Sequence, residues 1–293
     1  MLIIIIIAII IAIIIALIPV IYHDTHNFVV REYEIVSDKA KKDYTFTLLA
    51  DLHGYSFGKD NERLLKAIDD INPDAVLCAG DMFAAGGRLE DLDMRVGIKL
   101  VSDLAGRYKV FASNGNHEQK IKEYNKYYGD AFDEYKDGLV NSGVIYLENT
   151  SAYFDDGNVR ITGLELPLYY FGKFKKRKMH ESFLSRQLGD ISDKDEDKLN
   201  ILIAHNPVYF KQYASWGADI TVSGHVHGGI VRLPVLGGVI SPAIVLFPKY
   251  DGGMFTEGDK TMILSRGLGT HSINVRLFNP CELVVIRVRA AAK

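Results

Sequence analysis

Five short motifs of aspartate, asparagine and histidine each follow an apolar run of the chain. Five of the nine histidines fall within them, and the motifs are Asp51-Leu52-His53, Gly80-Asp81, Gly115-Asn116-His117-Glu118, His205 and Gly224-His225-Val226-His227. Carboxylates, imidazoles and an amide oxygen together suit first-row divalent cations such as Mn, Fe, Co, Ni or Zn. No cysteine belongs to these motifs, which disfavours a structural zinc site. The residue types therefore predict a metal centre.

Taken singly, each of these histidines reads best as a surface residue or a satisfied core residue, and Gly-Asn is a good turn sequence. Taken together, the five motifs are not explained in that way, because chance gives no reason for polar groups to recur behind apolar runs. The carboxyl ends of the strands in an α/β sheet converge on one crevice. We therefore expect the five motifs to meet in space.

The apolar runs before the motifs predict buried strands at 44–50, 74–79, 108–113, 199–204 and 219–223. Further strands are predicted at 28–36, 144–147, 152–155, 159–164, 261–265, 275–278 and 282–288, and near Ile244. Helical spacing predicts helices at 61–71, 89–104, 118–139 and 181–188. The third of these carries aromatic residues that we expect to form a core-facing stripe, namely Tyr124, Tyr127, Tyr128, Phe132 and Tyr135.

Strands and helices alternate in the first half of the chain, and strands dominate the second half. This order predicts an α/β (α+β) fold, a four-layer sandwich of two mixed β-sheets flanked by helices. The two cysteines, Cys78 and Cys281, lie in apolar runs and are expected to be buried side chains, not a disulfide. The formal net charge of −3 argues against nucleic acid as a partner.

The N-terminal segment is apolar from Leu2 to Tyr22 and contains no charged residue. About twenty helical residues span the hydrocarbon core of a bilayer, so residues 1–22 are predicted to be a single transmembrane anchor. A cleaved signal peptide fits less well, because there is no basic flank and no Ala-x-Ala-like site. Residues 23–43 are expected to form a linker and the first strand, and residues 44–293 the catalytic domain. We expect that domain on the extracytoplasmic side.

The order of the five motifs resembles that of the calcineurin-like metallophosphoesterase superfamily, over the chain from about Tyr44 onward. The resemblance implies two divalent cations, with Mn, Fe or Zn as the expected identities. Asp51, His53 and His227 would hold the first cation, Asn116, His205 and His225 the second, and Asp81 both. A hydroxide bridging the cations would attack a phosphodiester or pyrophosphate in line. His117 would donate a proton to the leaving oxygen or stabilise its charge. Glu118 could orient His117 or cap the following helix, and we favour the cap.

Later residues resemble the membrane-anchored or exported bacterial branch of the superfamily, which includes enzymes related to UDP-diacylglucosamine pyrophosphatases. They are 231–234, 265–269, 276–278 and 282–283. Two positions depart from the pattern. Ala84 stands where the superfamily often has aspartate, and Ile230 stands where the branch commonly has a polar residue. Both departures concern substrate positioning more than metal binding.

Residues 166–180 mix aromatic and basic side chains. The segment could be a substrate cap, an amphipathic patch on anionic lipid, or a solvated loop. Lys173, Lys175, Arg177 and Arg232 are the candidate substrate contacts. The expected partners are a phosphate-ester substrate that could be lipid-linked, and the membrane; the sequence specifies neither the substrate nor the oligomeric state. A scaffold of this fold without catalysis is the main alternative, but such scaffolds typically lose ligands that this chain retains.

Overall fold

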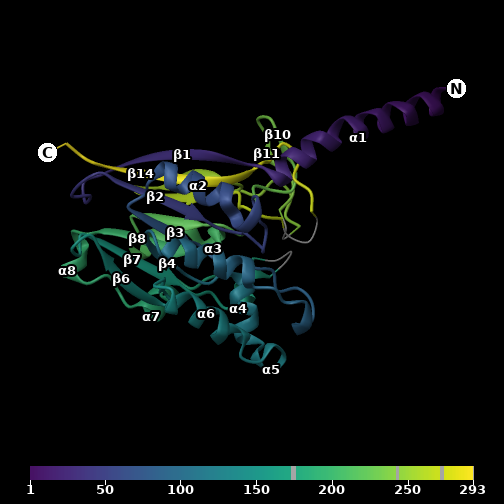
Figure 1. Ribbon diagram of the computed structural model, residues 1–293. Helices are drawn as coiled ribbons and strands as arrows, with labels where there is room; N and C mark the ends of the chain where they lie inside the picture. Colours follow the sequence, from purple (N-terminus) through teal and green to yellow (C-terminus); the bar gives the residue numbers. More distant parts are fainter. Residues whose placement is uncertain (173–175, 242–243, 271–273, 293) are drawn as a thin grey trace.

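Two six-stranded sheets pack face to face between helices in the computed structural model, which describes residues 1–172, 176–241, 244–270 and 274–292 (Figure 1). The sheets are mixed and helices lie against their outer faces, so the predicted four-layer sandwich is confirmed. The strands that precede the five polar motifs lie in the interior of these sheets, three in one and two in the other.

The first sheet has the order β1-β14-β2-β3-β4-β5. Strands β2 to β5 run parallel, whereas β14 is antiparallel to β2 and parallel to β1. Their bounds are β1 Phe28–Ser37, β2 Tyr44–Leu49, β3 Ala75–Cys78, β4 Lys109–Ala112, β5 Ile145–Tyr146 and β14 Cys281–Ala290. The carboxyl ends of β2, β3 and β4 therefore share one edge of the sheet.

The second sheet has the order β12-β13-β9-β8-β7-β6, with β13, β9, β8 and β7 parallel and an antiparallel strand on each side. Their bounds are β6 Thr150–Phe154, β7 Val159–Leu164, β8 Leu199–Ala204, β9 Ile220–Ser223, β12 Gly253–Glu257 and β13 Lys260–Leu264. A small hairpin, β10 (Arg232–Leu233) with β11 (Gly237–Gly238), stands apart from both sheets.

The core between the sheets is formed by side chains such as Phe46, Leu77, Ile203 and Val222, each at most 1% exposed. Helices α2 (Glu62–Ile71), α3 (Arg95–Ala105) and α6 (Ala131–Asn141) cover the first sheet, and α7 (Phe183–Leu188) and α9 (Phe210–Trp216) cover the second. Each large apolar side chain so buried contributes about 1.5–3 kcal/mol, which fixes the strand ends in place.

The N-terminal helix α1 spans Leu2–His26 and extends away from the sheets (Figure 1). It is long and apolar enough to cross a membrane, and none of its most apolar window is buried. Residues 23–26, expected as a linker, belong to this helix. Asp24 and Thr25 are buried against the domain, and the Asp24 carboxylate accepts the backbone N–H of Asn279 at 2.9 Å.

Two predicted helices were too long. The one expected at 118–139 is divided into α4 (Asn116–Glu123), α5 (Asn125–Tyr128) and α6. Tyr124, with φ −100° and ψ 38°, interrupts the helix between α4 and α5, and Gly129 turns the chain before α6 with a φ of 59°. Tyr124 and Tyr127 are consequently exposed, and only the other three members of the aromatic stripe are buried. The helix expected at 89–104 begins at Arg95, whose N–H is capped by the carboxylate of Asp93 at 3.0 Å.

Two predicted strands were wrong. The chain near Ile244 and at 275–278 forms only isolated bridges within the described residues. Arg276 explains the second case, because its buried guanidinium binds backbone carbonyls of Arg266 and Gly269 and holds the segment as a loop. Strand β12 was not predicted. The remaining short elements are α8 (Asp193–Glu196) and the 3₁₀ turns Lys59–Asn61, Leu89–Asp91, Leu168–Phe171 and Pro207–Tyr209.

Candidate metal centre

The five polar motifs meet where the carboxyl ends of β2, β3, β4, β8 and β9 face one another across the two sheets. Three overlapping clusters of ligand atoms, each within 4.8 Å, lie there. Asp51, His53 and His227 form the first cluster, Asp81, His205 and His225 the second, and His53, Asp81 and His117 the third. Sequence reasoning therefore located residues that the fold brings together from positions up to 176 apart.

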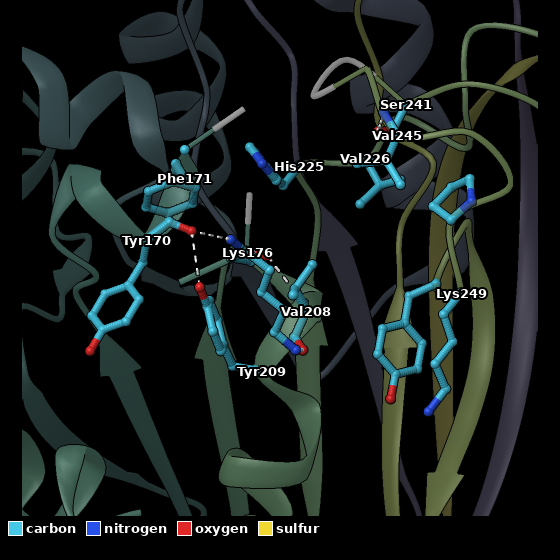
Figure 2. Close-up of a pocket in the computed structure, with 14 residues that line it drawn as sticks. Tyr170, Phe171, Lys176, Val208, Tyr209, His225, Val226, Ser241, Val245 and Lys249 are labelled. Atoms are coloured by element: carbon cyan, nitrogen blue, oxygen red, sulfur yellow. Dashed lines mark hydrogen bonds between the residues drawn. The ribbon is translucent and has the colours of Figure 1, made fainter. Parts of the chain in front are cut away.

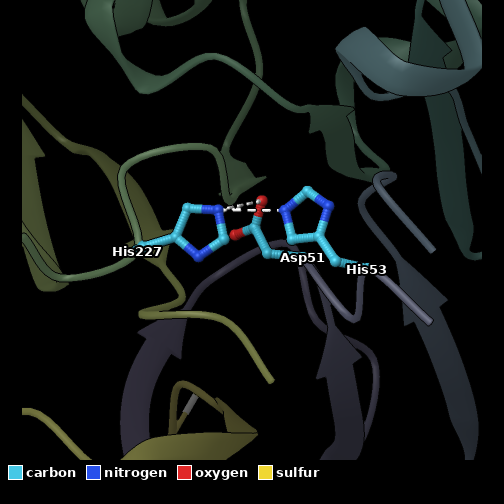
Figure 3. A group of neighbouring side chains, drawn as sticks. All are labelled: Asp51, His53 and His227. Carbon is cyan, nitrogen blue, oxygen red and sulfur yellow. Dashed lines mark hydrogen bonds and ion pairs between the residues drawn. The ribbon is translucent and has the colours of Figure 1, made fainter. Parts of the chain in front are cut away.

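In the first cluster the Nε2 atoms of His53 and His227 lie 3.0 Å apart, and Asp51 Oδ1 lies 3.6 Å from the same atom of His227 (Figure 3). Ligand atoms at about 2.1 Å from a first-row cation lie roughly 3 Å from one another. Asp51 is fully buried and also accepts the backbone N–H of His225 at 2.9 Å, which joins the loop after β9 to that after β2.

In the second cluster His205 Nε2 lies 3.1 Å from Asp81 Oδ2. The same Asp81 oxygen is 3.9 Å from His53 Nε2, so Asp81 stands between the two clusters. Asn116 is the first residue of α4, and its buried Oδ1 atom has no hydrogen-bond partner among the described residues. A buried amide oxygen without a partner is costly, and a cation would satisfy it. This donor set fits divalent cations.

The backbone at the centre is unusual, because Asp51, His53, Asp81, His225 and His227 all have φ between 50° and 75°. Residues with side chains adopt this left-handed conformation rarely, and such outliers concentrate at functional sites. Glycine is required at position 115 for a steric reason, because a Cβ atom there would lie 2.2 Å from Asp81 Oδ1. The glycine of this motif is required by close approach, not by its φ of −90°.

Glu118 connects the loops after β3 and β4. Its carboxylate accepts the N–H of Gly115 at 2.9 Å, as expected of a helix cap, and also the N–H groups of Asp81 and Met82 at 2.8 and 2.9 Å. Sequence reasoning found the cap but missed the two contacts across to β3. Nothing in the spacing could have revealed them, because they depend on how the two strands pair.

Three buried carboxylates share this small volume, and their pKa values reflect it. Burial and the charge of Asp81 raise the pKa of Glu118 to about 7. Burial likewise raises the pKa of Asp51 to about 7, against the opposing charge of His205. Burial alone would raise the pKa of Asp81, but the neighbouring histidines, His205 foremost, hold it well below its usual range. The cluster therefore favours added positive charge, which either protons or divalent cations supply.

The histidines differ in what their Nδ1 atoms contact. His205 Nδ1 lies 2.5 Å from the carbonyl oxygen of Ala79, and His227 Nδ1 lies 3.4 Å from that of Gly269. A carbonyl accepts only from N–H, so in the neutral form of both rings Nε2 presents a lone pair, as a metal ligand must. His117 is the reverse, because its Nδ1 accepts the N–H of Ala85 at 2.6 Å. Neutral His117 therefore carries its proton on Nε2, which faces Asp81 Oδ2 at 3.9 Å.

Two of the four candidate substrate contacts lie among the described residues. Lys173 and Lys175 lie outside the described residues. Arg177 is exposed and lies over the ring of Tyr169, 4.6 Å from its centre. Arg232 is engaged by the carbonyl oxygens of Gly228 and Asp251 at 2.8 and 2.6 Å, so its charge holds the β10 loop in place.

A pocket of about 370 Å³ opens beside His225. Figure 2 shows Phe171, Lys176 and Tyr209 on one wall and Val245 and Lys249 on the other, with His225 between them. The Phe171 ring lies 5.1 Å from that of His225. Sequence reasoning singled out the aromatic and basic content of 166–180, but it missed the second wall, because 241–250 has no motif to mark it.

Known proteins resemble this chain in sequence and in fold. The calcineurin-like phosphoesterase family matches residues 44–229. A metallophosphoesterase of Campylobacter jejuni, described as uncharacterised, is 25% identical over 272 residues, 89% of this chain but only 63% of that protein. The phosphodiesterase YaeI of Escherichia coli is 25% identical over 232 residues, covering 78% of this chain and 76% of the relative. The solved structure of TT1561 from Thermus thermophilus has a TM-score of 0.47 and 11% identity, over 77% of this chain and 89% of that one.

Proposed function

Because the chain belongs to the calcineurin-like phosphoesterase family, a family of phosphoester hydrolases, we propose that it is a membrane-anchored phosphohydrolase that uses two divalent cations to cleave a phosphodiester or pyrophosphate. The observation that carries the proposal is the position of Asp81, which belongs to one cluster with His53 and to another with His205 and His225. A carboxylate shared in this way is suited to join two cation sites.

Asp51, His53 and His227 would hold one cation and Asn116, His205 and His225 the other, with Asp81 common to both. Such cations, when bound, supply an activated water and neutralise charge on the phosphate oxygens. The protein residues fix the donor atoms: the carbonyl of Ala79 orients His205, and that of Gly269 orients His227. The donor set does not select among Mn, Fe and Zn.

His117 is the residue that would serve the leaving group. The Ala85 N–H fixes the tautomer in which Nε2 carries the proton, and burial lowers the pKa of the ring. The Nε2–H group, held beside Asp81, can donate to a leaving oxygen as negative charge develops there.

Helix α1 would place this site at a membrane surface, with the catalytic domain on the extracytoplasmic side. Its length and apolar composition support an anchor. The second candidate function is a lipid pyrophosphatase of the UDP-diacylglucosamine type, and the aromatic pocket beside His225 favours it.

The test is hydrolysis of bis-p-nitrophenyl phosphate by the full chain in detergent, loaded with Mn. We expect turnover, a loss of about 10²–10⁴-fold in His117→Ala, and unchanged metal content in that variant. His26→Ala, at an exposed histidine in the last turn of α1, is the matched control and should retain full activity. Metal loss in His117→Ala would show that His117 is a ligand. A fully loaded but inactive wild-type protein would instead support a scaffold without catalysis.

A further inference from the structure

Exposed apolar side chains gather in the two loops on either side of β11. They are Leu233, the last residue of β10, with Val235 and Leu236 in the loop that follows it, and Ile244, Leu246 and Phe247 in the second loop, with exposures from 39% to 105%. We call these six residues the apolar loop surface. Exposed apolar patches on a folded domain mark a site of contact with a membrane, another protein or a ligand. Val235, Ile244 and Phe247 also have positive φ, so backbone strain accompanies the outward position of these side chains.

The apolar loop surface lies next to the end of α1. Figure 1 shows β10 and β11 beside the base of that helix. Asn279 makes the connection, because its N–H donates to Asp24 of α1 while its side-chain amide donates to the carbonyl of Gly229, just before β10. Since Asp24 and Thr25 are buried, the loops have a fixed position relative to the helix end.

The position of the apolar loop surface beside α1 favours a lipid bilayer as the partner that covers it. The unburied apolar part of α1 ends at Tyr22, so a bilayer around it would have its surface at the level of the adjoining loops. The same bilayer would then cover the apolar loop surface without any further partner. Apolar side chains that enter the interface in this way add affinity in proportion to the area they bury.

The pocket beside His225 continues this surface. Val245 lies in its wall and is flanked in sequence by Ile244 and Leu246 of the apolar loop surface. Most of the lining is apolar or aromatic, and Lys176 and Lys249 add positive charge. A phosphoester whose phosphate reaches His225 would therefore lay its remaining part between aromatic walls, toward the membrane side.

We propose that the apolar loop surface inserts into the membrane interface beside α1, and that the pocket admits amphiphilic phosphoesters directly from the bilayer. The substrate class is thus a phosphodiester or pyrophosphate with an acyl or alkyl portion. The assignment of substrate rests on the proposed phosphohydrolase function, whereas the insertion of the loops does not.

The insertion is tested with the full chain in phosphatidylcholine–phosphatidylglycerol nanodiscs. Nitroxide labels are placed through Leu236→Cys and Phe247→Cys, with Tyr153→Cys on the distant strand β6 as the control. Both native thiols are buried, and burial raises the pKa of Cys78 to about 12, so labelling is confined to the new sites. We expect the collision rate of the two loop labels to be higher with oxygen, which concentrates in the bilayer, than with a polar nickel complex. The control label should collide more often with the nickel complex. Loop labels that behave like the control, or that are shielded from both reagents as in a protein contact, would overturn the proposal.

The substrate class is tested with Leu236→Asp combined with Phe247→Asp, against Val140→Asp on α6 as a control of equal charge per site. For an alkyl p-nitrophenyl phosphodiester embedded in vesicles, kcat/KM should fall about tenfold or more in the loop variant alone. Soluble bis-p-nitrophenyl phosphate should be hydrolysed equally by all three proteins. Equal losses on both substrates, or none on either, would overturn the inference. Failure of the wild-type protein on both substrates would overturn the proposed function, and leaves the label experiment to decide insertion.

Discussion

The carboxylate of Glu118 accepts the backbone N–H of Asp81 at 2.8 Å and so holds the candidate bridging ligand from a different strand end. We predict that Glu118→Gln lowers the free energy of unfolding by about 1–3 kcal/mol, because an amide NH₂ would face N–H groups that need an acceptor. Metal content should fall as well, since Asp81 loses its support. Chemical denaturation and elemental analysis measure the two effects. Glu134→Gln at an exposed site of α6 is the control, and equal behaviour of the two variants would contradict the prediction.

Gly115→Ala should remove most bound metal. The new Cβ would lie 2.2 Å from Asp81 Oδ1 and 2.5 Å from the Asp81 nitrogen, so the Asp81 carboxylate must move. Gly86→Ala is the matched control, because a Cβ at that position has nothing within 4 Å. Titration of the metal-depleted proteins with Mn compares them. Wild-type affinity in Gly115→Ala would show that the loops after β3 and β4 are looser than this packing implies.

Stability should depend on pH through Glu148. Burial alone would raise the pKa of Glu148, but hydrogen bonds from Lys122 and Lys136 outweigh it and lower the pKa. A carboxyl with a lowered pKa stabilises the fold above its unfolded pKa of about 4.3, and this contribution is lost as the pH falls through the folded pKa. Glu148→Gln should therefore cost about 1–2 kcal/mol at pH 7 and progressively less as the pH falls below about 4.3. Denaturant unfolding across this pH range checks the prediction, and a cost independent of pH would refute it.

Asp24→Ala should destabilise the whole domain although Asp24 lies in α1. A carboxylate in the last turn of a helix is destabilised by the negative end of the helix dipole. The hydrogen bond from the Asn279 N–H compensates for this repulsion. Without it the buried Asn279 N–H loses its acceptor, at a cost of about 1–3 kcal/mol. Thermal unfolding in detergent should show a lower Tm than for Asp38→Ala, whose side chain is exposed. Equal Tm values would mean that α1 and the domain are independent.

The sequence was sufficient for the layered fold because its buried strands are continuous apolar runs, and β7 and β8 match their predicted bounds. It failed where one residue changes the direction of the chain. Gly129 ends a helix that the spacing of apolar residues would continue, and Arg276 holds a loop where the pattern resembles a strand. Such effects depend on tertiary contacts that periodicity does not contain.

For the candidate site, the motifs predicted which residues are the candidate ligands. They did not predict the neighbouring groups that hold those ligands in position. The tautomer of His117 depends on Ala85, and that of His205 on Ala79, and both contacts come from backbone atoms that carry no sequence signal. The pocket wall formed by Ser241, Val245 and residues 248–250 was missed because no motif marks it. The local sequence identifies the side chains that could do chemistry, whereas the surrounding fold determines their protonation states and which ligands can reach them.

The left-handed residues at the centre have one more consequence. Because Asp51, His53, Asp81, His225 and His227 are held in a costly backbone conformation by neighbouring strands and loops, the geometry of the ligands is set by folding and not by the cations. The entropy of arranging the donors is then lost when the polypeptide folds. A cation would bind without first ordering its ligands, because the protein, and not the ion, specifies where the donor atoms stand.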